Sequence, residues 1–254
     1  MRKTIVCGIL ACALAAAADP PYAGRWKMNL AKSNFGESTI TYEPAAGGAM
    51  KVTMDGQSYT FTPDGKEVAT PWGTTTSIKA VDAKTWRMTE KTNGKVSMSG
   101  TLKLSEDGAT LSMTGTRIKP DGGTSDESMT LTRVSGGPGL AGKWRMKNMN
   151  ASAPESLELT PKGTDGVRIA IGGEGGVCDA TLDGKEHAAK GTMWPAGWSC
   201  VVTKAGDGLA VTWKRDGKEM YKINWTASAD GKTLVEKGSP AGVNEPFTIV
   251  YDRQ

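Results

Sequence analysis

The chain repeats itself after 118 residues, and this duplication constrains its fold more than any other feature. Gly-Arg-Trp-Lys-Met at residues 24–28 returns as Gly-Lys-Trp-Arg-Met at residues 142–146. The pattern Ser-x-Asp-Gly-x-Thr-Leu likewise occurs at residues 105–111 and again at 228–234. A solenoid unit would recur every 20–50 residues or so, and a repeat this long therefore indicates two copies of one domain.

Both copies have the pattern of antiparallel sheet. Asp-Gly and Asn-Gly pairs recur along the chain, and they favour type I′ hairpin turns because both central residues need φ > 0. Apolar and polar residues alternate between these turns, which is typical of sheets with one dry and one wet face. We therefore predict an all-β fold with little helix. The clearest apolar faces are Val96, Met98, Gly100, Leu102 and Leu104, followed by Leu111, Met113 and Gly115.

Consecutive hairpins indicate a meander, and closing a meander into a barrel leaves no unpaired edge. We therefore predict two tandem antiparallel up-and-down β-barrels, with a two-sheet sandwich as the structural alternative. The segment Ser135–Gly139 reads as a linker, since glycine resists regular structure and proline blocks a continuing ladder. The expected divisions are a first barrel at residues 19–135, a linker at 136–141 and a second barrel at 142–254.

Residues 1–18 have the organisation of a signal peptide. Arg2 and Lys3 precede an apolar stretch at residues 4–14, and four alanines at 15–18 supply small residues for cleavage before Asp19. The apolar stretch is shorter than the roughly 20 residues that a membrane-spanning helix needs. We therefore expect a periplasmic or secreted protein with no transmembrane segment. Alternatively, the segment that ends at Cys12 is similar to a lipobox, and the protein would be a lipoprotein anchored through Cys12.

Cleavage would leave two of the four cysteines, Cys178 and Cys200, both in the second copy. In an oxidising compartment an even pair predicts a disulfide, although two buried free thiols are the alternative. Cleavage would also lower the formal charge from +4 to +2, and the lysines form no basic block. We therefore expect no nucleic-acid partner. The sequence leaves the oligomeric state open.

The opening Gly-x-Trp of each copy, with a basic and an apolar residue after it, resembles the calycin superfamily of lipocalins and fatty-acid-binding proteins. The longer pattern Gly-x-Trp-Lys-Met-Asn-x-x-Lys-Ser-x-Phe at residues 24–35 is similar to exported bacterial lipocalin-like proteins. The second copy lacks the Lys-Ser-x-Phe part, and the full set of lipocalin motifs is absent. The resemblance implies that an arginine of the last strand covers the tryptophan and closes one barrel end. Trp26 with Arg133, and Trp144 with Arg253, match those positions.

Residues with catalytic chemistry are few. His187, the single histidine, could act as a general base or metal ligand, but it follows an Asp-Gly turn and we expect an exposed turn residue. Gly172–Gly176 lacks the Lys-Ser/Thr ending of a phosphate-binding loop. Asp126 and Glu127 could serve acid–base chemistry, but nothing singles them out among 27 acidic residues. We expect no catalytic residue, no cofactor and no metal site.

Two features bear on ligand binding. Methionine is flexible, and methionines on strands suit either an adaptable binding surface or an irregularly packed core. Trp194 and Trp198 lie on a long loop before Cys200, where they could form a ligand mouth, contact a partner or pack as a lid on their own barrel. The sequence leaves these alternatives open. The methionines at strand positions of the first copy are Met54, Met88, Met98, Met113 and Met129.

These observations predict a non-enzymatic binding protein for a small apolar molecule. The alternative is a cell-envelope interaction or structural protein whose barrels are filled, and the third candidate is a hydrolase or isomerase with a site at a barrel mouth. A binding protein needs an open pocket on the order of 300 Å³. Few charges appear on the inward strand faces, so we expect an uncharged or single-tailed apolar guest.

Overall fold

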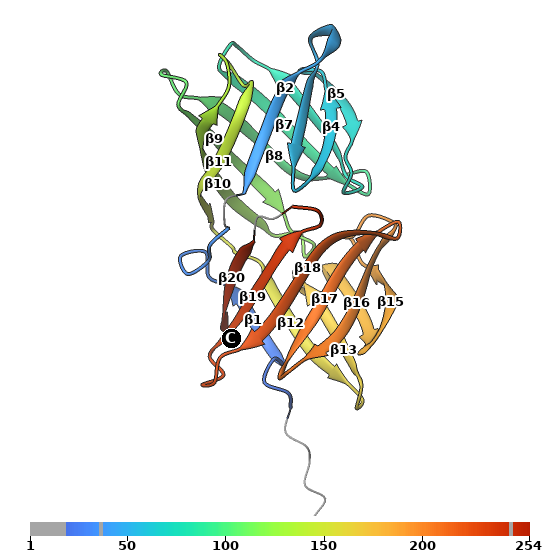
Figure 1. Ribbon diagram of the computed structural model, residues 1–254. Coiled ribbons are helices and arrows are strands. Elements are labelled where there is room, and N and C mark those ends of the chain that lie inside the picture. Colours follow the sequence, from blue (N-terminus) through green and yellow to red (C-terminus); the bar gives the residue numbers. More distant parts are fainter. Residues whose placement is uncertain (1–18, 36–37, 244–245) are drawn as a thin grey trace, which may run out of the picture.

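The protein consists of two ten-stranded antiparallel sheets, one closed into a barrel and the other nearly closed (Figure 1). The computed structural model describes residues 19–35, 38–243 and 246–254. The predicted all-β class with barrel architecture is confirmed. The signal peptide expected at residues 1–18, with Cys12, lies outside the described residues.

Barrel 1 is the nearly closed sheet, with strand order β4-β3-β2-β11-β10-β9-β8-β7-β6-β5. A short 3-10 turn, η1 (Ala46–Gly48), joins β2 to β3. The strands are β2 (Thr39–Pro44), β3 (Met50–Met54), β4 (Gln57–Phe61), β5 (Asp64–Ala69), β6 (Thr75–Ala80), β7 (Thr85–Thr92), β8 (Lys95–Leu104), β9 (Thr110–Ile118), β10 (Thr124–Ser135) and β11 (Gly142–Ala151).

Barrel 2 is the closed sheet, in which β1 lies between β12 and β20. A second 3-10 turn, η2 (Gly173–Gly175), joins β13 to β14. The strands are β1 (Gly24–Met28), β12 (Ser156–Lys162), β13 (Gly166–Ile171), β14 (Gly176–Thr181), β15 (Asp183–Lys190), β16 (Trp198–Ala205), β17 (Gly208–Arg215), β18 (Lys218–Ala227), β19 (Thr233–Pro240) and β20 (Phe247–Arg253).

The two Gly-x-Trp strands have changed places. β1, from the first copy, pairs with β12 and β20 of barrel 2, and Trp26 lies opposite Arg253. β11, from the second copy, pairs with β2 and β10 of barrel 1, and Trp144 lies opposite Arg133. In Figure 1 the blue strand β1 accordingly lies among the strands of the lower barrel. Barrel 1 is therefore one continuous stretch of chain, inserted between the first and second strands of barrel 2.

The exchange corrects the divisions expected from the sequence. Residues 136–141 do not link the two barrels, because they form the hairpin loop between β10 and β11 inside barrel 1. The glycine and proline residues that suggested a linker form an ordered loop instead. The Arg133 guanidinium fixes this loop by donating hydrogen bonds to the carbonyls of Gly137, Gly139 and Ala141. The chain instead passes between the barrels after β1 ends at Met28 and again at residues 152–155, between β11 and β12.

The exchange also corrects the pairing of the closure residues. The Arg253 guanidinium carbon lies 4.1 Å from the Trp26 ring centroid, and Arg133 lies 4.1 Å from that of Trp144. Both indoles are fully buried. Each indole nitrogen donates a hydrogen bond to the carbonyl four residues earlier, Trp26 to Tyr22 and Trp144 to Leu140. The predicted stacking of arginine on tryptophan is present, but each partner comes from the other copy.

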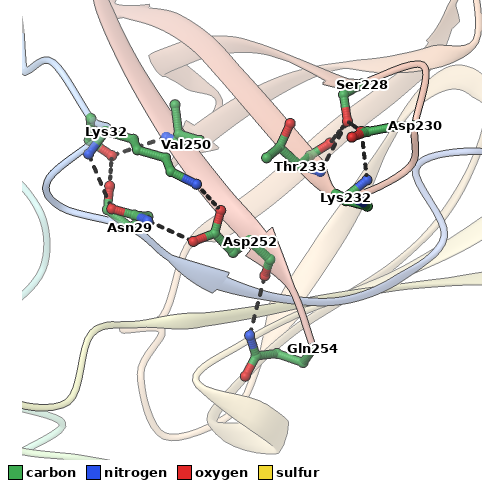
Figure 2. A network of polar contacts seen from close by, with 10 residues as sticks. Asn29, Lys32, Ser228, Asp230, Lys232, Thr233, Val250, Asp252 and Gln254 are labelled. Atoms are coloured by element: carbon green, nitrogen blue, oxygen red, sulfur yellow. Dashed lines mark hydrogen bonds and ion pairs between the residues drawn. The ribbon is translucent and has the colours of Figure 1, made fainter.

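The first crossing segment is fixed to the last strand of barrel 2. The Asn29 amide donates a 2.6 Å hydrogen bond to Asp252, and Lys32 forms a 2.8 Å ion pair with the same carboxylate (Figure 2). Further along, Asn34 exchanges two backbone hydrogen bonds with Thr248. The segment therefore leaves barrel 2 along β20 before it enters barrel 1 at β2.

The second repeated motif forms the same turn in both barrels. The Ser228 hydroxyl donates to Asp230 and accepts from the Thr233 backbone N–H (Figure 2), and Ser105 makes the matching bonds with Asp107 and Thr110. These side chains satisfy the backbone of the turn locally. The motif is therefore a structural element of the β8–β9 and β18–β19 hairpins.

The predicted type I′ turns occur at a minority of the Asp-Gly and Asn-Gly pairs. Both residues have positive φ at Asp55-Gly56, Asn93-Gly94 and Asp216-Gly217. The repeated Asp-Gly pairs at residues 64–65 and 183–184 lie at irregularities in the pairing of β5 with β6 and of β15 with β16. The apolar face predicted to begin at Val96 is shorter than expected. The pairing of β7 with β8 shifts near residue 97, and Val96 is therefore 39% exposed.

The disulfide predicted between Cys178 and Cys200 is present. It joins β14 to β16 across β15, where barrel 2 is weakly paired, since β14 and β15 share the register only at Val177–Lys190 and Cys178–Ala189. In barrel 1 the equivalent strands β4 and β5 are the two ends of the open sheet. The disulfide therefore reinforces the seam at which the barrel without a disulfide stays unpaired.

Residues 38–151, expressed alone, should fold cooperatively because they contain every strand of barrel 1 and its own Arg133–Trp144 pair. Residues 38–135 should not, because they lack β11. Thermal melting followed by circular dichroism checks this. An equally cooperative transition in both fragments would contradict the role assigned to β11.

Trp26→Ala should destabilise barrel 2 by about 3–5 kcal/mol, the usual cost of truncating a core tryptophan, and should spare barrel 1. Trp144→Ala is the matched control and should have the reverse effect. Hydrogen exchange resolved to peptides measures protection in each barrel separately. Loss of protection in barrel 1 on Trp26→Ala would argue against the exchange.

Replacement of Cys178 and Cys200 by serine should destabilise barrel 2 by roughly 3 kcal/mol, the chain-entropy estimate for a closed loop of this size. Exchange of the β14 and β15 amides should accelerate first, because the seam loses its covalent bridge. Denaturant unfolding and hydrogen exchange measure the two effects. An unchanged exchange pattern at β14 and β15 would show that the disulfide does not hold the seam.

Candidate ligand-binding site

The interior of barrel 2 contains a cavity of about 240 Å³. It lies among inward-facing side chains of β17 to β20, and the residue before β12 closes one side. Most of its wall is apolar or aromatic, as in ligand pockets in general. The lining residues are Met28, Glu155, Ser156, Leu157, Ile171, Trp213, Tyr221, Ile223, Trp225, Glu236, Phe247 and Tyr251.

Glu236 is a buried carboxyl group in this wall, with 7% of its surface exposed. Its Oε2 accepts a 2.8 Å hydrogen bond from the Trp225 indole and a 2.9 Å hydrogen bond from the Tyr251 hydroxyl. Oε1 has no hydrogen-bond partner among the described residues. Burial raises the pKa of Glu236, and the two donated hydrogen bonds oppose the rise only in part. The group is therefore an oriented polar contact in an otherwise apolar chamber.

Glu155 supplies a second carboxyl group to the same wall. It lies on the second crossing segment, where its backbone carbonyl accepts a 2.9 Å hydrogen bond from the Met28 N–H of β1. Burial raises the pKa of Glu155, whereas the charges of Arg117 and Lys119 from barrel 1 lower it. The strand exchange thus places this carboxyl group between the interior of barrel 2 and the charged edge of barrel 1.

A second cavity of about 230 Å³ lies between the barrels. Two side chains, Tyr221 and Phe247, line both cavities and therefore stand between them. Tyr221 is held in place from barrel 1, because its hydroxyl donates to Asp55 at 2.9 Å and accepts from the Trp72 indole at 3.2 Å. The interface cavity is lined by Phe35, Ser38, Thr39, Ile40, Met54, Asp55, Met129, Met146, Tyr221, Pro240, Phe247 and Ile249.

The methionines predicted to line the first barrel divide into two groups, one at the interface cavity and one in the packed core. Met54 and Met129 line the interface cavity, joined by Met146 of β11. Met98 is buried in barrel 1, while Met88 and Met113 pack against the main apolar cluster of that barrel. Both alternatives that the sequence left open therefore occur. Some methionines form a cavity wall at the mouth of barrel 1, and others pack further inside it.

Barrel 1 carries an inward ion pair that the sequence analysis missed. Arg117 of β9 makes two hydrogen bonds to Glu127 of β10, at 2.7 and 3.1 Å, and Glu127 is only 8% exposed. Glu90 of β7 lies near the same arginine, and burial raises its pKa. The expectation of few inward charges was therefore wrong. One more step of the alternation from Leu111, Met113 and Gly115 would have placed Arg117 inward.

Glu236 was missed for the same reason. It follows the buried Leu234 by two residues on β19, and period-two alternation therefore directs it into the barrel. Glu155 has no comparable signal, because it lies outside the strands. Its place depends on the strand exchange.

The tryptophan loop packs on its own barrel and contacts the neighbouring one. Trp198 is buried, and its indole donates a 2.9 Å hydrogen bond to the Trp72 carbonyl of barrel 1. Trp194 stacks on Trp213 at 4.8 Å between centroids, and the Asn93 amide of barrel 1 donates to its carbonyl. Neither Trp194 nor Trp198 lines the two cavities described above. Trp213, on which Trp194 stacks, lines the barrel 2 cavity.

The remaining candidates do not line the barrel 2 cavity, although the crevice beside Gly172 shares Glu155 and Ser156 with it. His187 is partly exposed, and its Nε2 lies 3.0 Å from the Thr181 hydroxyl. Gly172–Gly176 surrounds η2 and borders a crevice of about 380 Å³ between the barrels. Among the described residues, no group of three or more His, Cys, Asp or Glu side chains is placed to hold a metal ion. The four closure residues, Trp26, Arg133, Trp144 and Arg253, line neither cavity.

Comparison with models of known protein families finds no match, and neither does a search of curated protein sequences. Within the part of the chain that the structure describes, no helix is long and apolar enough to cross a membrane.

The raised pKa of Glu236 predicts a pH-dependent stability. The folded protein binds this proton more tightly than the unfolded chain does, so the contribution of Glu236 to stability is greatest below the usual pKa of 4.5 and is lost as pH rises above it. Glu236→Gln removes this loss, since the amide does not ionise. The free energy of unfolding of the variant, relative to wild type, should therefore increase between about pH 4 and pH 7.

Chemical denaturation at several pH values measures this difference. Glu219→Gln, the same substitution at an exposed position of β18, is the matched control. A relative stability of Glu236→Gln that stays constant over the range would mean that the carboxyl group is not held away from water.

Proposed function

We propose that this protein is an exported, non-enzymatic binding protein for a small apolar molecule. The observation that carries the proposal is the pair of apolar cavities that meet at Tyr221 and Phe247. Alone, each cavity, about 240 Å³ in barrel 2 and about 230 Å³ beside it, is smaller than the usual range of roughly 300–1,000 Å³, and we therefore propose that the ligand occupies both and passes between Tyr221 and Phe247. The ligand lies with one end in barrel 2 and the other against the methionines at the mouth of barrel 1.

Two further features support the classification and the compartment. An arginine stacked on the tryptophan of a Gly-x-Trp strand in each barrel fits the lipocalin-like closure that the sequence resembles, although in barrel 1 this strand, β11, comes last in the chain. A disulfide across the barrel seam fits an oxidising compartment, either periplasmic or extracellular.

The filled-barrel alternative draws on barrel 1. Its deep interior is packed by large apolar side chains, and Arg117 and Glu127 occupy part of the remaining space with a charged pair. In that alternative, barrel 1 contributes a packed surface for a cell-envelope partner rather than a ligand chamber. The buried side chains include Phe61, Ile78, Leu111, Leu131 and Trp144.

Titration with an uncharged hydrophobic fluorophore, N-phenyl-1-naphthylamine, tests the proposal. Saturable binding is expected with a dissociation constant in the micromolar range or below. Ile171→Trp, which fills the barrel 2 cavity, should weaken binding by about tenfold or more, which corresponds to the loss of roughly 1.4 kcal/mol. Ile118→Trp, the same change at a residue that is 45% exposed, should leave binding unchanged.

Native mass spectrometry after gentle purification provides an independent measurement, since a bound guest should appear as added mass. Absence of both saturable fluorophore binding and any co-purified small molecule would favour the filled-barrel alternative.

A further inference from the structure

The wall of the barrel 2 cavity has an unusual balance of charge. Two carboxyl groups, Glu155 and Glu236, line it, and no lysine, arginine or histidine does so among the described residues. Five of the other lining residues are aromatic. Aromatic faces attract cations through their quadrupole, and carboxylates attract them directly. The aromatic residues are Trp213, Tyr221, Trp225, Phe247 and Tyr251.

The two carboxyl groups are not equivalent. Glu155 faces Arg117 and Lys119 of barrel 1, which offset its charge from outside the cavity. Glu236 receives hydrogen bonds only from two neutral donors, the Trp225 indole and the Tyr251 hydroxyl. Because a buried charge is costly without an opposite charge, Glu236 is the group that would gain most from a cationic partner.

The geometry leaves one oxygen of Glu236 for such a partner. Both protein donors bind Oε2, and they come from the strands on either side of β19, which orients the carboxyl group. Oε1 remains without a hydrogen-bond partner in the described part of the chain. A donor on a ligand can therefore reach the carboxyl group without displacing either protein donor.

We propose that the ligand of barrel 2 is an apolar amine whose protonated nitrogen donates a hydrogen bond to Glu236 Oε1 while the aromatic wall covers its apolar body. The inference rests on the proposed function and adds the chemical class of the ligand. An anion such as a fatty-acid carboxylate would meet two acidic groups and no basic one in this cavity. An alcohol could bond to Oε1 but would gain no charge pairing.

Competition on the full chain tests the inference. Bound N-phenyl-1-naphthylamine is displaced with 1-decylamine, 1-decanol or decanoate, which share one chain and differ in head group, at concentrations where none self-associates. Decylamine should displace the fluorophore at a concentration roughly tenfold or more below that of decanol, as expected for a hydrogen bond to a charged group. Decanoate should be the weakest competitor.

Glu236→Gln locates the effect. The amide keeps an acceptor for Trp225 and Tyr251 but removes the charge, so decylamine and decanol should then compete within about threefold of each other. Glu219→Gln, the same substitution on exposed β18, should keep the wild-type order. If Glu236→Gln does not fold, the wild-type comparison still decides the charge preference. Glu155→Gln then measures the share of the second carboxyl group, and complete loss of the amine preference in this variant would overturn the assignment to Glu236.

The outcomes separate the two proposals. Fluorophore binding with decanol or decanoate equal to or better than decylamine overturns the amine inference and leaves the proposed function standing. A tenfold amine preference that survives in Glu236→Gln overturns the assignment of this carboxyl group. Failure of the fluorophore to bind overturns the proposed function and the inference with it.

Discussion

Pairing of each Gly-x-Trp strand with the arginine-bearing strand of its barrel, β1 with β20 and β11 with β10, is the interaction on which the rest of the structure depends. The stacking of a guanidinium on a buried indole stabilises the folded state by roughly 0.5–2 kcal/mol. Each guanidinium also donates hydrogen bonds to backbone carbonyls of the segment that precedes the tryptophan. Because the two copies carry nearly the same strand, either strand offers the contacts that either barrel needs. The short loop after β10 favours the nearer one, β11, and β1 then completes barrel 2.

This exchange ties the two barrels to each other through shared strands. Two segments cross between them, and the network of Asn29, Lys32 and Asp252 fixes the first of these to β20 (Figure 2). The second crossing brings Glu155 to the wall of the barrel 2 cavity. Contacts of Tyr221 with Asp55 and Trp72 then hold a cavity residue of barrel 2 from barrel 1. The interface cavity between the barrels is therefore a consequence of the exchange of β1 and β11.

The polar groups inside the barrels have distinct roles. Arg117 and Glu127 form a self-satisfied ion pair in barrel 1, so that pair needs no ligand. Glu236 is oriented by two neutral donors that both bind Oε2, and its Oε1 receives no hydrogen bond from the described residues. The two barrels thus hold buried carboxyl groups in two ways, with a basic partner at Glu127 and with neutral donors at Glu236.

The sequence by itself determined the all-β class and the duplication, because these rest on local periodicity and repeated motifs. The even pair of cysteines predicted the Cys178–Cys200 disulfide, and the resemblance to calycin barrels implied an arginine–tryptophan closure. Extended by one step, the same alternation would also have placed Arg117 and Glu236 inside. Only the tertiary structure decided which copy of Gly-x-Trp completes which barrel, and therefore where Glu155 and the interface cavity lie. The physical reason is that two nearly identical strands satisfy the same hydrogen bonds and the same closure contact, and local patterns carry no information about which long-range partner is chosen.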